Sequence, residues 1–211
     1  GFISVRSQTN TRYVNAFGDD FELYPIPNEN WHILPGLDTM NFRYFSKSAF
    51  AGSSCVTVQN FKAAKNEVDA MISHTINVDN SKSLLLTFKF AFAERIVGNS
   101  DVLRIYVSDD CGATWNLENS RLGPFLRTTS AKINDTAWYP ILASNWAMAT
   151  LSLDKYAYNP TPIMLKFEFE NGGGNNFYLD EVLLTTTIGT EELFADGAPS
   201  VYPNPAHDFV T

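Results

Sequence analysis

Acidic side chains of this 211-residue sequence stand at residues 19–22, at Asp69 and at residues 180–181, and carboxylate oxygens are the ligands that hard cations prefer. Glu22 belongs to the first group, near the start of the predicted domain, and Asp180 and Glu181 form the last, near its final predicted strand. If the first and last strands lie side by side, Glu22 and Asp180 can share a structural Ca²⁺, with backbone carbonyls completing its shell of about six to eight oxygens. The alternative is that these carboxylates only accept hydrogen bonds from backbone N–H groups in turns.

A further acidic pair, Glu168 and Glu170, falls on one face of a predicted strand. Paired carboxylates can supply the acid and the nucleophile for glycoside hydrolysis, whereas outward glutamates on a strand usually form a solvated face. The three histidines, His32, His74 and His207, are scattered, and neither H-E-x-x-H nor G-x-S-x-G occurs. We therefore predict a noncatalytic chain with no zinc site and no organic cofactor.

The sequence has two cysteines, Cys55 and Cys111, and leaves two alternatives open for them. In an oxidising compartment they can form a disulfide, and equally they can remain as two buried thiols. A chain of this length can bury enough core to be stable without a disulfide.

Large aromatic side chains offer another kind of chemistry, because they can stack on sugar rings. Most are expected to pack in the core or at its rim, as is usual in small sandwiches. The candidates for a stacking platform are Trp31, Trp115, Trp138, Tyr139, Trp146, Tyr156 and Tyr158.

The overall composition excludes several classes of function. Fifteen basic and twenty-three acidic residues give a net charge of −8, and no basic cluster is present that could neutralise phosphates, so nucleic-acid binding is not expected. No apolar run is long enough to predict a transmembrane segment. Aromatic residues make up 14% of the chain, with 16 Phe and 9 Tyr, which favours strands over helices.

Alternation of apolar and polar residues marks the elements that must position these side chains. It predicts strands at 84–92, 103–107, 163–169 and 177–184, and more weakly at 55–58, 70–73 and 146–153. The phase changes between Leu179 and Val182, which indicates a β-bulge near 180–181. Helical character is confined to a short turn at 61–67. The predicted fold is all-β, an antiparallel two-sheet β-sandwich of jelly-roll type.

Two loop motifs have structural interpretations. Residues 108–115 fit the pattern S-x-D-x-G-x-T-W of an Asp-box, in which Asp110 accepts hydrogen bonds across a turn, Gly112 supplies an unusual φ and Trp115 folds back onto the hairpin. The glycine-rich stretch 171–176 lacks the order of a phosphate-binding loop, so it is predicted to be a hairpin loop that could rim a ligand face.

The chain is expected to continue beyond one domain at both ends. Residues 1–14 are interpreted as the end of a preceding module or a linker, 15–186 as the sandwich, 187–199 as a linker and 200–211 as a terminal segment. The run from Tyr202 to Ala206, Y-P-N-P-A, resembles the start of the sorting signal read by the type IX secretion system. That resemblance implies export through an outer membrane to the medium or the cell surface, with only the first strand of the signal present in 200–211.

Several short motifs, taken in order, resemble a MAM-like jelly roll of the choice-of-anchor or cleaved-adhesin type over about residues 15–186. They are Asp20-Phe21-Glu22 with Asn30-Trp31, the run from Asp69 to Ser73, the 84–92 strand, Asp101-Val102-Leu103, the run from Asp109 to Gly112, Trp146, and the run from Asn175 to Asp180. Such modules lie between catalytic domains and type IX sorting signals in pappalysin-like metalloproteases and gingipain-type proteins. Calcium stabilises loops in cleaved-adhesin relatives, which implies the same role for Glu22 and Asp180. The proline usual after the Ile-Ser pair is replaced here by His74.

The sequence thus predicts a noncatalytic accessory domain of a secreted multidomain protein, such as a metalloprotease. Its expected partners are an extracellular protein surface, a glycan surface or its own catalytic domain. The alternative prediction is a carbohydrate-binding module of a glycan-degrading protein.

Overall fold

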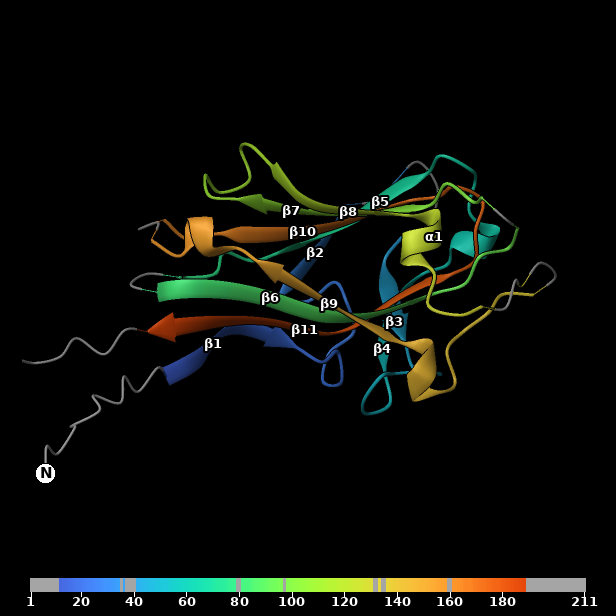
Figure 1. Cartoon of the computed structure of the whole chain (residues 1–211), viewed down its shortest axis with the longest axis horizontal. Coiled ribbons are helices and arrows are strands. Elements are labelled where there is room, and N and C mark those ends of the chain that lie inside the picture. Colours follow the sequence, from blue (N-terminus) through green and yellow to red (C-terminus); the bar gives the residue numbers. More distant parts are fainter. Residues whose placement is uncertain are drawn as a thin grey trace, which may run out of the picture.

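The computed structural model describes residues 12–188, apart from 35, 37–40, 79–80, 97, 131–132, 134–135 and 159–160. Two antiparallel sheets lie face to face over one hydrophobic core (Figure 1). The predicted all-β sandwich is therefore confirmed. Residues 189–199 of the predicted linker 187–199, and the predicted sorting segment 200–211, lie outside the described residues, as do residues 1–11.

The larger sheet has six strands in the order β3-β4-β11-β6-β9, and β1 also pairs with β11. Its strands are β1 (Arg12–Asp19), β3 (Arg43–Phe45), β4 (Cys55–Val58), β6 (Ser81–Phe92), β9 (Ala147–Ser152) and β11 (Phe177–Ile188). The two outermost strands in sequence, β1 and β11, lie side by side, as the sequence argument required.

The smaller sheet has five strands in the order β2-β5-β10-β7-β8. Its strands are β2 (Trp31–Leu34), β5 (Val68–Ser73), β7 (Val102–Ser108), β8 (Asn116–Leu122) and β10 (Met164–Glu170). Non-local pairing dominates both sheets, because neighbours such as β5 and β10 are far apart in sequence.

Helical segments are short and lie between strands. They are η1 (Asn60–Lys62), α1 (Gly123–Leu126), η2 (Ala143–Asn145) and η3 (Asp154–Tyr156), of which three are 3₁₀ turns and α1 is a single α-helical turn. The helical turn predicted at 61–67 is reduced to the 3₁₀ turn η1. No helix in the described part of the chain is long and apolar enough to cross a membrane.

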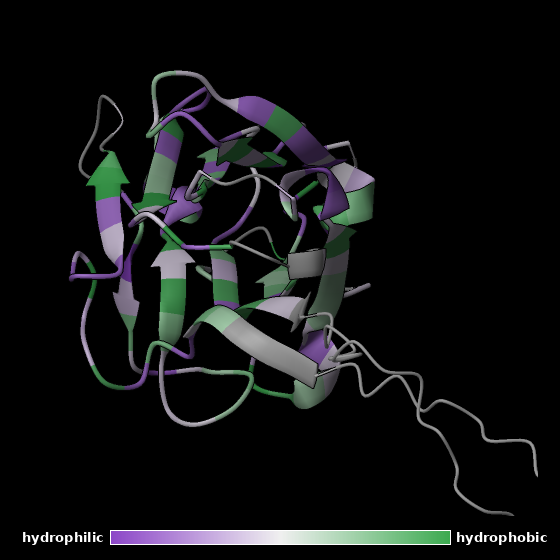
Figure 2. Ribbon diagram, turned by 90° about the vertical axis from the view of Figure 1, so that its left-hand side faces the viewer, coloured by the Kyte–Doolittle hydropathy of each residue, from purple (hydrophilic) through white to green (hydrophobic). Residues whose placement is uncertain are grey.

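The core follows from the alternation in β6, whose residues Leu84, Leu86, Phe88, Phe90 and Phe92 all face inward and are buried. Each such side chain contributes roughly 1.5–3 kcal/mol by leaving water. The alternation is visible as banding along the strands in Figure 2.

Aromatic rings join the two sheets across this core. Phe169 of β10 stacks on Phe177 of β11 with ring centroids 4.8 Å apart, and Trp31 of β2 meets Phe17 of β1 edge-on at 5.4 Å. The buried indole of Trp31 also donates a hydrogen bond of 3.0 Å to Asp19, so its polar atom is satisfied.

The bulge predicted near 180–181 is present, because the pairing of β11 with β6 shifts register between Asp180 and Leu183. Glu181 adopts a φ of +50° there, a left-handed conformation that is uncommon for a residue with a side chain. The bulge lies at the point where β11 exchanges β4 for β1 as its neighbour.

Candidate functional site

Glu22, the first predicted calcium ligand, holds the loop 50–54. Its Oε1 accepts hydrogen bonds from the backbone N–H groups of Ser53 (2.9 Å) and Ser54 (2.8 Å), and its Oε2 accepts one from the Ser53 hydroxyl (2.8 Å). Slight burial raises the pKa of Glu22, but the hydrogen bonds from Ser53 and Ser54 outweigh it and the pKa is lowered. Gly52 has a φ of +73°, and a Cβ there would lie 2.4 Å from Glu22 Oε1, so only glycine fits under this carboxylate.

Asp180, the second predicted ligand, is fully buried and holds the other end of the same loop. Its Oδ2 accepts a 2.7 Å hydrogen bond from the Phe50 N–H, and its Oδ1 accepts one of 2.8 Å from the Glu181 N–H. Burial is the main influence on this carboxyl group and raises its pKa to about 7, although these hydrogen bonds lower it.

The structure therefore brings Glu22 and Asp180 together around one loop. The pKa of the Cys55 thiol is raised by its burial and then by the charges of Asp180 and Glu22, so both carboxylates act on the same buried atom. Their oxygens suit Ca²⁺ in kind, and serine hydroxyls and loop carbonyls are close by. Among the described residues no group of three or more His, Cys, Asp or Glu side chains is arranged to hold a metal ion, so backbone and hydroxyl oxygens would have to supply most of the shell.

The cysteines are both free thiols, so the disulfide alternative is wrong. Cys55 is buried in β4 of the six-stranded sheet, whereas Cys111 is exposed in the turn after β7 of the five-stranded sheet. The alternative of two buried thiols is correct for Cys55 only. The buried position of Cys55 in a strand and the exposed position of Cys111 in a turn keep the two thiols apart.

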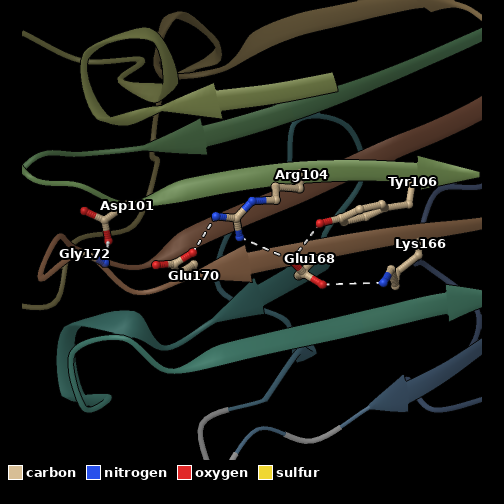
Figure 3. A network of polar contacts seen from close by, with 7 residues as sticks. All are labelled: Asp101, Arg104, Tyr106, Lys166, Glu168, Glu170 and Gly172. Atoms are coloured by element: carbon tan, nitrogen blue, oxygen red, sulfur yellow. Dashed lines mark hydrogen bonds and ion pairs between the residues drawn. The ribbon is translucent and has the colours of Figure 1, made fainter. Parts of the chain in front are cut away.

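Glu168 and Glu170 lie on the outer face of β10, where both contact the same guanidinium (Figure 3). Arg104 Nη1 is 3.2 Å from Glu168 Oε1, and its Nη2 is 2.6 Å from Glu170 Oε2. Tyr106 donates a 3.2 Å hydrogen bond to Glu168, and the Lys166 ammonium lies 3.5 Å from the same carboxylate. Both carboxylates are thus engaged as anions with cations, an arrangement that does not suit a general acid.

The two carboxylates in turn stabilise the charged form of Arg104. Partial burial lowers the pKa of Arg104, but the hydrogen bond and charge of Glu170, with the charge of Glu168, raise it above its ordinary value. The pKa of Tyr106 is also raised, by burial first and then by Glu168.

Two partly exposed aromatic rings complete this surface. The Lys166 ammonium lies 4.1 Å from the ring centroid of Tyr106 and 5.0 Å from that of Trp115, within the range of cation–π contact. We call the outer surface of the five-stranded sheet at β7 and β10, together with the neighbouring Trp115, the polar face. Its six side chains are Arg104, Tyr106, Trp115, Lys166, Glu168 and Glu170.

The Asp-box positions Trp115 at the edge of the polar face. Asp110 accepts hydrogen bonds from Ser108 Oγ (2.7 Å), the Thr114 N–H (2.8 Å) and Thr114 Oγ1 (2.5 Å), and those from Thr114 contribute most to lowering its pKa to about 2. Gly112 has a φ of +86°, as the motif requires. The Asp-box thus forms a turn in the structure.

The glycine-rich loop is closed by Asp101, which is fully buried. Asp101 Oδ1 accepts hydrogen bonds from the N–H groups of Gly172 (3.0 Å) and Gly174 (3.1 Å) and from Asn60 Nδ2 (2.7 Å). A Cβ at Gly172 would lie 2.1 Å from the Asp101 backbone nitrogen, so the glycine permits this close approach. The N–H groups of Gly172 and Gly174 are thus bound to Asp101, and that of Gly173 is bound to Asn171 Oδ1, so these three N–H groups are not free to bind a phosphate.

The aromatic candidates divide between core and surface. Trp31, Trp146 and Tyr156 are buried and belong to the packing, whereas Tyr139 and Tyr158 are 42% and 75% exposed. Trp138 packs edge-on against Tyr178 at 6.1 Å.

Two hollows accompany these surfaces. One, of about 460 Å³, lies beside the bulge, and its acidic lining residues include Asp20, Glu29 and Glu181. The other, of about 210 Å³, is formed by residues that no sequence motif connects, and we call it the lysine pocket. It is lined by Phe45, Lys47, Gln59, Lys62, Ala137, Tyr139, Asn176 and Tyr178.

A scan of protein-family models finds no match to the sequence, and no curated protein matches it. Solved structures do match in fold. The K1 and K3 cleaved adhesin domains of Lys-gingipain from Porphyromonas gingivalis each superimpose with a TM-score of 0.55, at 18% and 19% identity, covering 82% of this chain and 98% and 99% of theirs. TmCBM27, a carbohydrate-binding module that recognises mannan, superimposes at 0.50 with 14% identity, over 83% of this chain and 98% of its own. These likenesses establish the β-sandwich that the resemblance predicted.

Proposed function

We propose that this chain is a noncatalytic binding domain, an accessory part of a larger secreted protein, whose polar face contacts an extracellular macromolecule or its own catalytic domain. The observation that carries the proposal is the sharing of Arg104 by Glu168 and Glu170. The acidic pair that the sequence offers for glycoside hydrolysis is held by one cation, with Arg104 in contact with both carboxylates. The fold is one that adhesin domains and carbohydrate-binding modules also use, which supports a binding role.

Two measurements test the noncatalytic proposal. The purified domain is assayed with chromogenic glycosides, esters and a casein substrate, and then for binding to immobilised extracellular proteins. We expect no turnover, and binding that weakens on Arg104→Met, because the face loses the cation that holds both Glu168 and Glu170. Turnover that disappears in Glu168→Gln would contradict the proposal.

A second candidate ligand is a glycan, and Trp115 and Tyr106 specifically favour it. Their rings are partly exposed beside a cation and two carboxylates, the combination of one apolar surface and a few fixed polar groups that ligand sites use. Electrophoresis through gels containing mannan, xylan or galactan measures this directly. We expect retardation by at least one polysaccharide, lost in Trp115→Ala and retained in Tyr158→Ala, which removes an exposed ring outside the polar face.

We further propose that Ca²⁺ binds at the loop 50–54, held by Glu22 and Asp180 and serving a structural role. The support is the oxygen-rich character of the site and the raised pKa of Asp180, which a neighbouring cation would bring down. Thermal unfolding with Ca²⁺ and with excess chelator tests this, since a ligand of the folded state raises Tm. An unchanged Tm at millimolar Ca²⁺ would exclude a site of useful affinity.

Export to the medium or the cell surface through the outer membrane is also proposed, from the Y-P-N-P-A run at 202–206. In a host with a type IX secretion system, the full-length protein carrying Pro203→Ala and Pro205→Ala should remain inside the cell, while its total amount stays the same. Undiminished export of this variant would count against the signal.

A further inference from the structure

The lysine pocket lies on the side of the molecule where β3, the 3₁₀ turn η1 and the start of β11 meet. Phe45 is the last residue of β3, Lys62 ends η1, and Asn176 and Tyr178 flank the first residue of β11. Tyr139 comes from the segment between α1 and η2. Its volume of about 210 Å³ is below the roughly 300–1,000 Å³ of pockets for drug-sized ligands, so it suits a single ring.

The wall of the pocket is aromatic and fixed. The Phe45 ring packs against Tyr178 at 5.2 Å and against Tyr139 at 6.0 Å. Tyr178 donates a 2.7 Å hydrogen bond to the Trp138 carbonyl and accepts one of 3.3 Å from Asn176 Nδ2. The side-chain amide oxygen of Asn176, Oδ1, accepts a 3.0 Å hydrogen bond from the Phe61 N–H of η1. The side chains of the wall are therefore already ordered before a ligand enters, so binding loses little conformational entropy.

The pocket is locally cationic on an acidic protein. Lys47 and Lys62 line it, and no described lining residue carries a carboxylate, although the chain as a whole has a net charge of −8. Other basic side chains in the described part of the chain, such as Arg104, Arg127 and Lys155, form ion pairs, whereas these two lysines have no such partner among the described residues. Burial raises the pKa of Tyr178, so its phenol stays neutral and adds no negative charge.

We propose that the lysine pocket binds one pyranose ring bearing a carboxylate, a uronic acid residue. The aromatic wall suits the C–H face of a sugar ring, the amides of Gln59 and Asn176 suit its hydroxyl groups, and the two ammonium groups suit its carboxylate. An aromatic acid would match the wall and the lysines but would offer no hydroxyl groups to the Gln59 amide or to the remaining N–H of the Asn176 amide. The inference does not rest on the polar face, because the two sites share no residue.

The test measures binding of glucuronic and galacturonic acid by NMR chemical-shift titration of the ¹⁵N-labelled domain. Glucose has the same ring without the charge, and benzoate has a ring and a charge without hydroxyl groups. We expect saturable shifts at the pocket for at least one uronic acid, with affinity at least about tenfold above that for glucose and for benzoate. Added salt should weaken the binding, because the ammonium groups are exposed.

Three variants locate the site. The double variant Lys47→Ala/Lys62→Ala should weaken uronic acid binding about tenfold or more, and Tyr139→Ala should weaken glucose and uronic acid binding alike. Lys65→Ala removes an exposed lysine of the neighbouring turn, which does not line the pocket, and should leave the affinity unchanged. Trp115→Ala should also have no effect, which separates this site from the polar face.

Several outcomes would overturn the inference. They are equal affinity for glucose and uronic acids, tighter binding of benzoate, unchanged binding in the double lysine variant, or no saturation at about 50 mM sugar, a concentration far above typical site affinities. If the pocket binds as expected while the polar face binds no macromolecule, the proposed function fails and this inference stands.

Discussion

Two carboxylate pairs in this protein are candidates for a functional site in the sequence, and the structure gives them different environments. Glu22 and Asp180 receive hydrogen bonds mainly from the backbone and hydroxyl groups of the loop 50–54, whereas Glu168 and Glu170 are held by the side chains of Arg104, Tyr106 and Lys166. The first pair is tied to main chain that cannot move away without opening the fold. The second pair is tied to side chains that can exchange their partner for a ligand. A carboxylate's partner, more than its spacing, thus indicates whether it serves structure or binding.

Replacing Asp180 is expected to have the largest effect on stability. Replacement by Ala leaves the N–H groups of Phe50 and Glu181 unpaired in a buried site, and we expect a loss of about 3 kcal/mol in the free energy of unfolding. Urea denaturation measures it. Glu29→Ala, an exposed carboxylate, is the control and should change stability by less than about 0.5 kcal/mol.

A loss below about 1 kcal/mol at Asp180 would show that the loop 50–54 does not depend on this side chain.

The pH dependence of stability gives the next largest effect. The pKa of Asp180 is raised to about 7 in the folded protein, whereas an unfolded aspartate titrates near pH ~4. Between these values the folded state keeps a proton that the unfolded state has released, so stability should fall as pH rises from about 4 to 7. We expect a change of about 1–2 kcal/mol after solvent screening, measured by urea midpoints in the presence of chelator.

The Asp180→Asn variant should lack this slope, since the amide does not titrate. A slope equal to that of the unaltered protein would assign it to another group.

Glu22 should matter less than Asp180, because it is only half-buried and water can replace part of its contacts. Glu22→Ala is expected to cost about 1–2 kcal/mol, mainly from the lost hydrogen bonds to Ser53 and Ser54. Because the pKa of Glu22 is lowered in the folded protein, its contribution to stability depends on pH in the opposite direction to that of Asp180. The contribution is lost as pH falls through the folded pKa. Differential scanning calorimetry at pH 7 and pH 4 measures both effects, and an equal Tm penalty at the two pH values would contradict the assignment.

The smallest expected effect is at the polar face. Arg104→Met should change stability by less than about 1 kcal/mol, because ion pairs of partly exposed side chains contribute little. Arg127→Met is the contrasting variant, since its partner Glu94 is only 2% exposed and would be left as a buried, unpaired charge. Urea midpoints should separate the two variants. Equal losses of stability would show that the buried Glu94 and the partly exposed Glu168 and Glu170 depend on their cations to the same degree.

The sequence predicts the strands that have one buried face. The alternation in β6, β7 and β10 and the phase change in β11 lead directly to the observed elements and bulge. It misses β1, β2, β3 and β8. The edge strand β8 (Asn116–Leu122) has no fully buried residue and therefore no alternation, and β3 has only three residues.

The candidate sites divide in the same way. The meeting of Glu22 and Asp180 follows from the adjacency of the first and last strands, but their partner loop is 130 residues from Asp180 in sequence, a separation that no local pattern records. The lysine pocket is assembled from four separate segments, so Lys47, Lys62 and Tyr139 form no motif. The disulfide alternative was wrong because the number of cysteines does not show that Cys55 is buried in a strand while Cys111 is exposed in a turn.

The pairing of Arg12 with Ile188 places the entry and exit of the sandwich on adjacent strands that run in opposite directions (Figure 1). Tension applied to the chain through these two points would load the hydrogen bonds between β1 and β11 one at a time, as in a zipper, and would not shear them together. The register shift at Asn15 and Phe17 gives the peeling an early weak point. Under load, this sandwich is therefore expected to yield first at β1, while the strands that form the lysine pocket and the polar face stay paired.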